Sequence, residues 1–236
     1  MADWKELEKR FTERLALERR PVAVTFLDAA PSGIEKFSGS EPAGCSFWRL
    51  AAGGRTFYTV PADHFNCAVG SYTHSIQLPP ERVGEIETTL KMMFNVGYVK
   101  PEEVPGIARL PKEPAAVVFA PLADAPLPPS VVLFACKTSS AMLLNEASIR
   151  AGASSTLPLL GRPSCMALPA ALAHGTVSTL GCIGNRVYTG LSAEEMYVVV
   201  PGNKLEAVSD ALGIIATANA TLEEFARGRQ ASLSSV

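Results

Sequence analysis

Four cysteines lie in two similar stretches of the chain, and their thiols could do chemistry. In the first stretch, Cys45 begins CSFWRLAAGG, RTFYTV follows, and Cys67 lies in NCAVGSY. In the second, Cys165 precedes MALPAALAHG and TVSTL, and Cys182 lies in GCIGNR. Each stretch therefore contains a cysteine, a short apolar helix, a glycine, a β-branched strand and a second cysteine near a glycine. This echo predicts four thiols in two related positions.

Thiolates select zinc, iron–sulfur clusters and other soft metals. Structural zinc usually takes closely spaced C-x2–4-C pairs, and none of the five cysteines is paired that closely. Dispersed thiolates can instead be gathered by the fold around an iron–sulfur cluster, so the spacing favours a cluster over zinc. The alternative is that several of these residues are ordinary buried cysteines, because free cysteine is among the most buried residue types. Cys136, directly after a buried strand, is expected to be such a core residue.

The segment GCIGNR is expected to form a tight turn that carries a site. Gly181 and Gly184 allow a close approach of the backbone, and the turn, including Asn185, could aim amides at an anion or at cluster sulfides. Arg186 would favour the thiolate form of Cys182. The alternative is a plain Gly-Asn turn with a solvated arginine. No Gly-Lys-Ser/Thr follows, so a phosphate loop is excluded.

Three histidines occur in the chain. His64 precedes Cys67 by three residues in HFNCAVGSYTHS, an expected site loop over 64–75, and is a candidate ligand or proton carrier. His74 is expected to be a hydrogen-bonding surface residue. His174 is expected at the end of a short helix, where it would interact with the helix dipole.

Composition places the protein among soluble globular domains. Apolar residues make up 47% of the 236 residues and the net charge is −2, which gives no basic patch for nucleic acid or an anionic membrane. The start MADWKELEKRF has no apolar signal region, and no apolar run reaches the roughly 20 residues of a membrane helix. We therefore expect a cytoplasmic protein, where structural disulfides are rare.

Periodicity predicts a mixed α/β fold. Helical spacing of apolar residues covers 3–19, and a strand of β-branched residues follows at 21–27. The other predicted helices lie at 45–52, 80–99, 138–150 and from 203 onward, and the other strands at 56–60, 115–120, 130–135 and 195–201. We expect one module over 1–236 with two related, intimately packed halves at about 20–100 and 113–220. Each half would hold short strands, a cysteine half-helix and a long helix.

Several of these segments resemble the domain-of-unknown-function 169 family. The resemblance rests on PVAVTF after a W-x-x-L helix, CSFWRLAAGG, HFNCAVG, and GCIGNRVYTG followed by EEMYVVVP, and it extends over roughly residues 4–220. It implies a single full-length module in a cytoplasmic prokaryotic setting, and its cysteine segments match Cys45, Cys67, Cys165 and Cys182. It implies no particular activity.

Three functions follow from the residues. The first is a redox or accessory protein that binds an iron–sulfur cluster or another soft metal at the four cysteines and serves a partner protein. The second is a metal-free module that binds a small anionic ligand or cofactor at GCIGNR. The third is a thiol-dependent enzyme with Cys182 as nucleophile, which ranks last because no base is evident.

Overall fold

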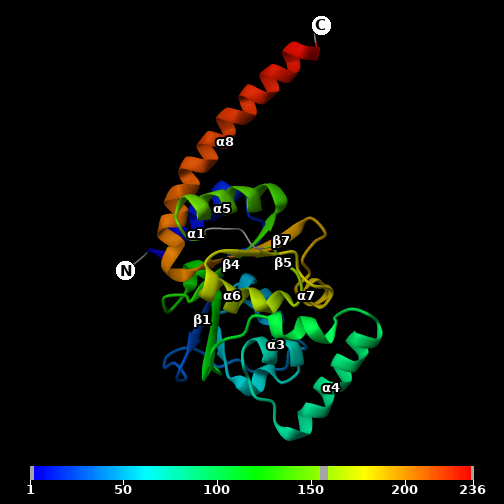
Figure 1. Cartoon of the computed structure of the whole chain (residues 1–236). Helices are drawn as coiled ribbons and strands as arrows, with labels where there is room; N and C mark the ends of the chain where they lie inside the picture. The colour runs from blue at the N-terminus through cyan, green and yellow to red at the C-terminus, as the bar shows by residue number, and fades with distance from the viewer. Residues whose placement is uncertain (1–2, 155–158, 235–236) are drawn as a thin grey trace.

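The computed structural model describes residues 3–154 and 159–234, which fold around one mixed sheet (Figure 1). Within the described residues the sheet has seven strands in the order β2-β3-β1-β4-β7-β6-β5. Neighbouring strands are antiparallel except β5 and β6, which are parallel. The strands are β1 (Val22–Leu27), β2 (Phe57–Thr59), β3 (Ala116–Pro121), β4 (Val131–Lys137), β5 (Leu159–Leu160), β6 (Val177–Thr179) and β7 (Glu195–Pro201).

Helices connect the strands and cover both faces of the sheet, which confirms the mixed α/β class. The α-helices are α1 (Trp4–Leu15), α2 (Ser46–Ala52), α3 (Ala68–Thr73), α4 (Pro80–Asn95), α5 (Thr138–Arg150), α6 (Ala167–His174), α7 (Ile183–Thr189) and α8 (Leu205–Ser234). The 3-10 helices are η1 (Pro61–His64), η2 (Pro101–Gly106), η3 (Leu122–Asp124), η4 (Ser164–Met166) and η5 (Gly202–Lys204).

Alternating side chains along the strands build two separate cores. In β4, Val131 and Leu133 join the core under α2 and α6, whereas Val132 and Phe134 join the core under α1, α5 and α8. This separation follows from the two-residue period of a strand, because successive side chains point to opposite faces. Figure 1 shows α5 and α6 on opposite sides of the sheet. The two faces therefore carry different helices and can carry different functions.

Corresponding elements follow each other in the same order on the two sides of the sheet centre. β1 and β4 pair at the centre, with Val22 opposite Leu133. Going outward, β3 and then β2 lie beside β1, whereas β7 and then β6 lie beside β4. The strands predicted in RTFYTV and TVSTL are β2 and β6, which thus occupy corresponding places. β2 is antiparallel to its neighbour β3, and β6 is antiparallel to its neighbour β7. The division into halves at 20–100 and 113–220 stays a prediction.

Segment 64–75 was expected to be a loop, and that prediction was wrong. The chain forms η1 and then α3, in which Ser71 and Thr73 are buried and hydrogen-bond to the carbonyls of His64 and Gly70 at 3.0 Å each. A helix of six residues is too short for an apolar periodicity to be visible in the sequence. Packing of its small polar residues inside the molecule decides its conformation.

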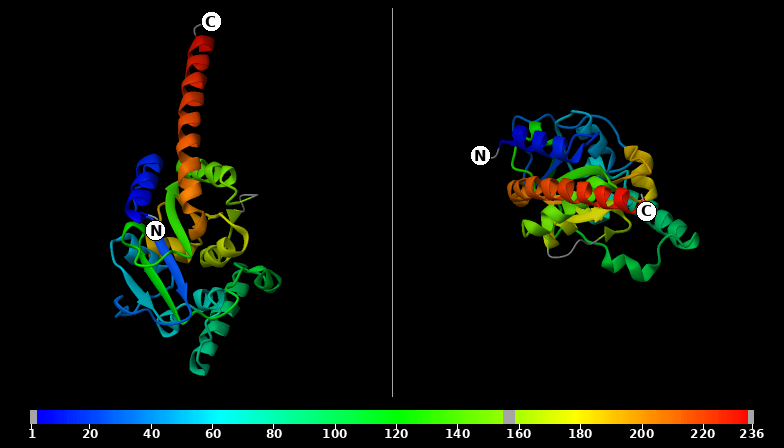
Figure 2. Two further views of the ribbon diagram at one scale, coloured as in Figure 1. Left: turned by 90° about the vertical axis from the view of Figure 1, so that its left-hand side faces the viewer. Right: turned by 90° about the horizontal axis from the view of Figure 1, so that it is seen from above.

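Two helices project from the sheet layers. α4 lies outside the two cores, and none of its residues is buried. The far end of α8 extends well beyond the rest of the molecule (Figure 2). Among the described helices, none combines the length and the apolar character needed to span a membrane.

Gly202, at the start of η5, is required by a close backbone contact. A Cβ atom there would lie 1.7 Å from the Pro129 carbonyl oxygen and 2.7 Å from its carbon. Because both atoms belong to backbone, relief requires moving the β3–β4 connection or the end of β7. We expect Gly202→Ala to lower the free energy of unfolding by about 3 kcal/mol or more. Urea denaturation measures this change.

Gly84→Ala in α4 is the matched control for Gly202→Ala. A Cβ atom at Gly84 meets nothing within 4 Å, so this variant should keep or slightly gain stability because alanine favours helix. Equal urea midpoints of unfolding for the two variants would contradict this prediction, because they would show that the β3–β4 connection can shift to accommodate a Cβ atom at Gly202 at little cost in stability.

Candidate functional site

The four cysteines of the two similar stretches all lie where helices begin, on the α2/α6 side of the sheet. Cys45 directly precedes α2, Cys67 precedes α3, and Cys182 precedes α7. Cys165 lies in η4, which leads into α6. Because α2 packs against α7 and α3 packs against η4, the starts of these helices come from both halves of the sequence into one region.

Electrostatic interactions show that the four thiols are neighbours. Burial, followed by the nearby Cys67 and Cys182 thiols, raises the pKa of the Cys45 thiol to about 12. Burial also raises the pKa of Cys165 well above its usual range, with additional contributions from Cys67, Cys182 and Cys45. Thiolates that repel each other in this way are stabilised by a shared cation. The structure therefore brings together thiols that lie far apart in the sequence.

Cys136 lies apart from these four thiols. It belongs to the core on the opposite face of the sheet, under α5 and α8, and its thiol donates to the Phe134 carbonyl at 3.4 Å. Burial raises its pKa to about 12. It packs as a small apolar residue. Because it is buried but distant from the other four cysteines, its substitution can serve as a control for theirs.

The Asn185 side chain is a buried polar group beside the thiols. It is 2% exposed, and neither its Nδ2 nor its Oδ1 atom has a hydrogen-bond partner. It approaches the Cys45 thiol, whose pKa it lowers against the larger effect of burial, without reaching hydrogen-bond geometry. A buried amide without partners costs about 1–3 kcal/mol. Such a group calls for a ligand or water that it can bind.

The segment GCIGNR was expected to be a turn, and it is the start of helix α7. Gly181 has a φ of +79° just before the helix, whereas Gly184 and Asn185 lie within it. Asn185 and Thr189 are buried on its inner side, and this packing fixes a helix that the two glycines alone did not indicate. The Cys182 N–H donates to Ser164 Oγ at 2.5 Å, which ties the segments of Cys182 and Cys165 together.

Arg186 serves the fold and does not face the thiols as a free cation. Its guanidinium donates to the backbone carbonyls of Ser192, Leu180 and Glu195. It therefore links α7 to the start of β7, and its guanidinium is occupied by hydrogen bonds to the backbone. The expectation that Arg186 activates Cys182 or binds an anion loses its main support.

His64 and His74 form a buried pair, so the expected surface position of His74 was wrong. Their side chains are 2% and 3% exposed, and their rings stack with centroids 5.8 Å apart. His64 Nε2 lies 2.8 Å from Thr59 Oγ1, and His74 Nδ1 lies 2.8 Å from the Gly70 carbonyl oxygen. Burial lowers the pKa of His64 to about 3 and that of His74 to about 4, so both are neutral.

His64 keeps one ring nitrogen without a partner. Its Nδ1 atom is buried and makes no hydrogen bond, and it would lie 3.5 Å from a Cβ atom on Gly44, the residue before Cys45. The sequence spacing had marked His64 as a candidate, and its location beside the Cys45 segment is compatible with that prediction. Its role as a ligand or proton carrier stays a prediction.

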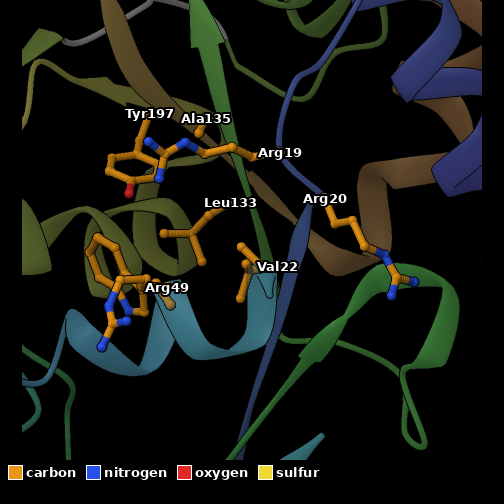
Figure 3. A pocket seen from close by; sticks show the side chains of 9 residues that line it. Arg19, Arg20, Val22, Arg49, Leu133, Ala135 and Tyr197 are labelled. Atoms are coloured by element: carbon orange, nitrogen blue, oxygen red, sulfur yellow. The ribbon is translucent and has the colours of Figure 1, made fainter. Parts of the chain in front are cut away.

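A hollow on the same side of the sheet is built from Trp48, Tyr197 and three arginines (Figure 3). It encloses about 270 Å³, which includes space open to solvent. In Figure 3 Arg19 extends over Tyr197, whereas Arg20 points away. Each arginine is paired: Arg19 with Glu195 at 3.2 Å, Arg20 with Glu8 at 2.8 Å, and Arg49 with Glu41 at 3.6 Å. The hollow therefore ranks below the thiols as a candidate site.

The thiols are not arranged around a single point. Among residues 3–154 and 159–234, no three His, Cys, Asp or Glu side chains are placed to hold one metal ion. The site therefore consists of neighbouring thiols that do not converge on one ion position, together with the unpartnered Asn185 amide. This arrangement limits which metal group it could accept.

Comparison with known proteins places the chain in a family. An uncharacterized protein of Methanocaldococcus jannaschii, MJ0308, is 27% identical over 221 residues, which cover 88% of this chain and 93% of the archaeal protein. No solved structure matches the chain. The model of DUF169, described as uncharacterised ArCR, matches residues 10–211, a range that includes all four cysteines of the site. The chain belongs to the DUF169 family.

Proposed function

We propose that this protein binds an iron–sulfur cluster through Cys45, Cys67, Cys165 and Cys182. The observation that carries the proposal is geometric: α2 packs against α7, the Cys182 N–H donates to Ser164 beside Cys165, and η4 packs against α3, so four cysteine segments adjoin one another. Buried thiols that raise one another's pKa are unfavourable as thiolates by themselves, and a bound metal group reverses this by supplying positive charge.

A cluster fits the thiols better than a single ion. A tetrahedral zinc ion with bonds of about 2.3 Å needs its four sulfurs within about 3.8 Å of each other. The described residues offer no group of three ligands placed for one ion. A cluster holds its thiolates farther apart because iron and sulfide atoms lie between them. The Asn185 amide would then hydrogen-bond a sulfur of the bound group, an interaction that tunes the reduction potential of clusters.

The other two functions receive less support. An anion module at GCIGNR would need Arg186 or free backbone amides, and Arg186 is bound to three carbonyls. A thiol enzyme with Cys182 as nucleophile needs a group that activates the thiol, whereas Arg186, the expected activator, is bound to backbone carbonyls. A cluster in this position would serve a redox or accessory role toward a partner protein, as expected from the dispersed cysteines.

Purification without oxygen tests the proposal. We expect the protein, isolated or reconstituted with iron and sulfide, to contain both elements and to absorb visible light with charge-transfer bands that bleach on reduction. The metal-free chain should keep its fold by circular dichroism. Stoichiometric zinc without iron or sulfide would reject the cluster and indicate a site for a single soft ion. A sample that binds no metal after reconstitution with iron and sulfide would reject the proposal.

Metal uptake should depend steeply on pH. Binding requires thiolates, and the raised pKa values of Cys45 and Cys165 keep both thiols protonated near neutral pH. If at least these two protons leave on binding, the apparent affinity of the metal-free chain for Cd²⁺ should rise about 100-fold or more per pH unit. Titrations followed by thiolate–metal absorbance at several pH values measure this slope. A pH-independent affinity would mean that carboxylates or other groups bind the ion.

A further inference from the structure

The C-terminal part of α8 is a solvent-exposed helix. The first turns of α8 pack against α5 and α1, with Val208 and Leu212 fully buried. The Asn219 side chain donates to Glu146 of α5 at 3.0 Å. From Ala220 to Leu233 every residue is exposed, and Figures 1 and 2 show this segment extending away from the rest of the molecule.

Local interactions give this segment little stability of its own. Isolated helices shorter than about 12–15 residues are marginal in water. Gly228 disfavours a helix relative to alanine, and the Glu223–Arg227 pair, both exposed, adds little. Packing against a second molecule would therefore add stability to this segment.

The exposed segment carries an apolar stripe that a second helix could cover. Ile214, Leu222, Phe225 and Leu233 are 52%, 63%, 66% and 68% exposed. At 3.6 residues per turn these four positions lie within about 100° of the helix circumference, and the exposed Arg229 lies in the same sector. Exposed large apolar side chains in one stripe mark an interaction surface more often than scattered ones do.

The stripe is complementary to itself. Leu222 follows Ile214 by eight positions, and Leu233 follows Phe225 by the same eight positions. Two copies of α8 that run antiparallel about a two-fold axis can therefore place Leu222 opposite Phe225 and, in the same register, Ile214 opposite Leu233. A two-fold interface requires such reciprocal contacts.

Charge supports the same register. When Leu222 lies opposite Phe225, Asn219 lies at the level of Gly228 of the second copy. Glu146, held at Asn219, would then lie near Arg229, which falls within the stripe, whereas Arg227 points to the other side of the helix and pairs with Glu223. A parallel arrangement would bring like residues to the same level and place Arg229 beside its own copy.

We propose that this protein is a homodimer formed by antiparallel pairing of residues 214–233 of α8. The interface joins two copies through protruding helices and leaves the cysteine side of each sheet free. It is independent of whether the thiols bind a cluster, so either proposal can fail alone.

The mass of the full chain in solution tests the dimer. Light scattering after size exclusion should give twice the chain mass of 25.0 kDa. Phe225→Glu should weaken association about tenfold or more, because it places a charge in the centre of the stripe. Ala220→Glu adds the same charge to an exposed position on the other side of the helix and should remain dimeric. A monomeric wild type, or equal masses for both variants, would overturn the proposal.

Cross-linking tests the register. Ile214→Cys and Leu233→Cys chains, mixed under reduction and then oxidised, should form a disulfide-linked dimer between the two variants. Each variant alone should cross-link no more than the wild type, since antiparallel pairing puts equivalent positions about 28 Å apart along the helix axis. Efficient self-linking of each single variant would indicate parallel pairing and reject the antiparallel interface. Masses above the dimer that grow with concentration would instead indicate an open, head-to-tail contact.

Discussion

Replacing Cys45 or Cys165 by serine is expected to remove the bound cluster, with iron and sulfide falling from full to below about a tenth of wild-type occupancy. Serine has nearly the same volume as cysteine but a much higher hydroxyl pKa, so it is a poor ligand for soft metals. Cys182→Ser and Cys67→Ser should act in the same direction. Iron content, sulfide content and the visible spectrum measure the loss.

Cys136→Ser is the matched control for this series. It makes the same chemical change in a buried residue on the opposite face of the sheet, so it should keep the cluster and lose about 1 kcal/mol or more of stability. Melting temperatures of the metal-free variants separate loss of ligand from loss of fold. Full occupancy in Cys182→Ser would remove that residue from the site, and full occupancy in all four variants would end the four-thiolate proposal.

Acid should unfold the metal-free protein through His64 and His74. Both pKa values are lowered in the folded state, to about 3 and about 4, from an ordinary value of 6.5. The unfolded chain therefore binds more protons below pH 6.5, and the folded state loses stability as the pH falls. The loss begins near pH 6.5 and continues until the folded pKa values are reached. At pH 5 it should amount to about 2 kcal/mol per histidine, or about 4 kcal/mol together.

Urea denaturation at pH values from 7 to 4 measures this effect. His64→Gln removes one titrating group and can keep the contact with Thr59, so it should reduce the difference in stability between pH 7 and pH 5 by about 2 kcal/mol. His174→Gln is the control, because His174 is exposed at the end of α6. If both variants keep the wild-type pH dependence, carboxylates and not the buried histidines govern acid unfolding.

The elements of the fold were largely predictable from local patterns. Runs of β-branched and aromatic residues identified β1, β3, β4 and β7, and the spacing of Trp4, Leu7 and Phe11 identified α1. These patterns report burial of one strand or helix face, which depends on the sequence within a few residues. The same local similarity revealed that the cysteine stretches correspond, and the strands β2 and β6 do take corresponding places in the sheet.

Tertiary structure decided what short segments become and which residues meet. The glycines of GCIGNR indicated a turn, but burial of Asn185 and Thr189 makes the segment a helix. His74 resembled a surface loop residue, and its packing against His64 and Phe26 makes it a core residue. Short segments carry too little periodicity to fix their own conformation, so contacts with distant elements decide it.

The sequence by itself determined the mixed α/β class, the family and the four cysteines in corresponding stretches. Only the tertiary structure decided that Cys45, Cys165 and Cys182 lie close enough to affect one another, that Asn185 is buried beside them without a partner, and that Cys136 lies behind the sheet. The physical reason is that residue types and spacing follow local rules, whereas the meeting of residues far apart in the chain depends on how the sheet assembles and which helices pack on each face.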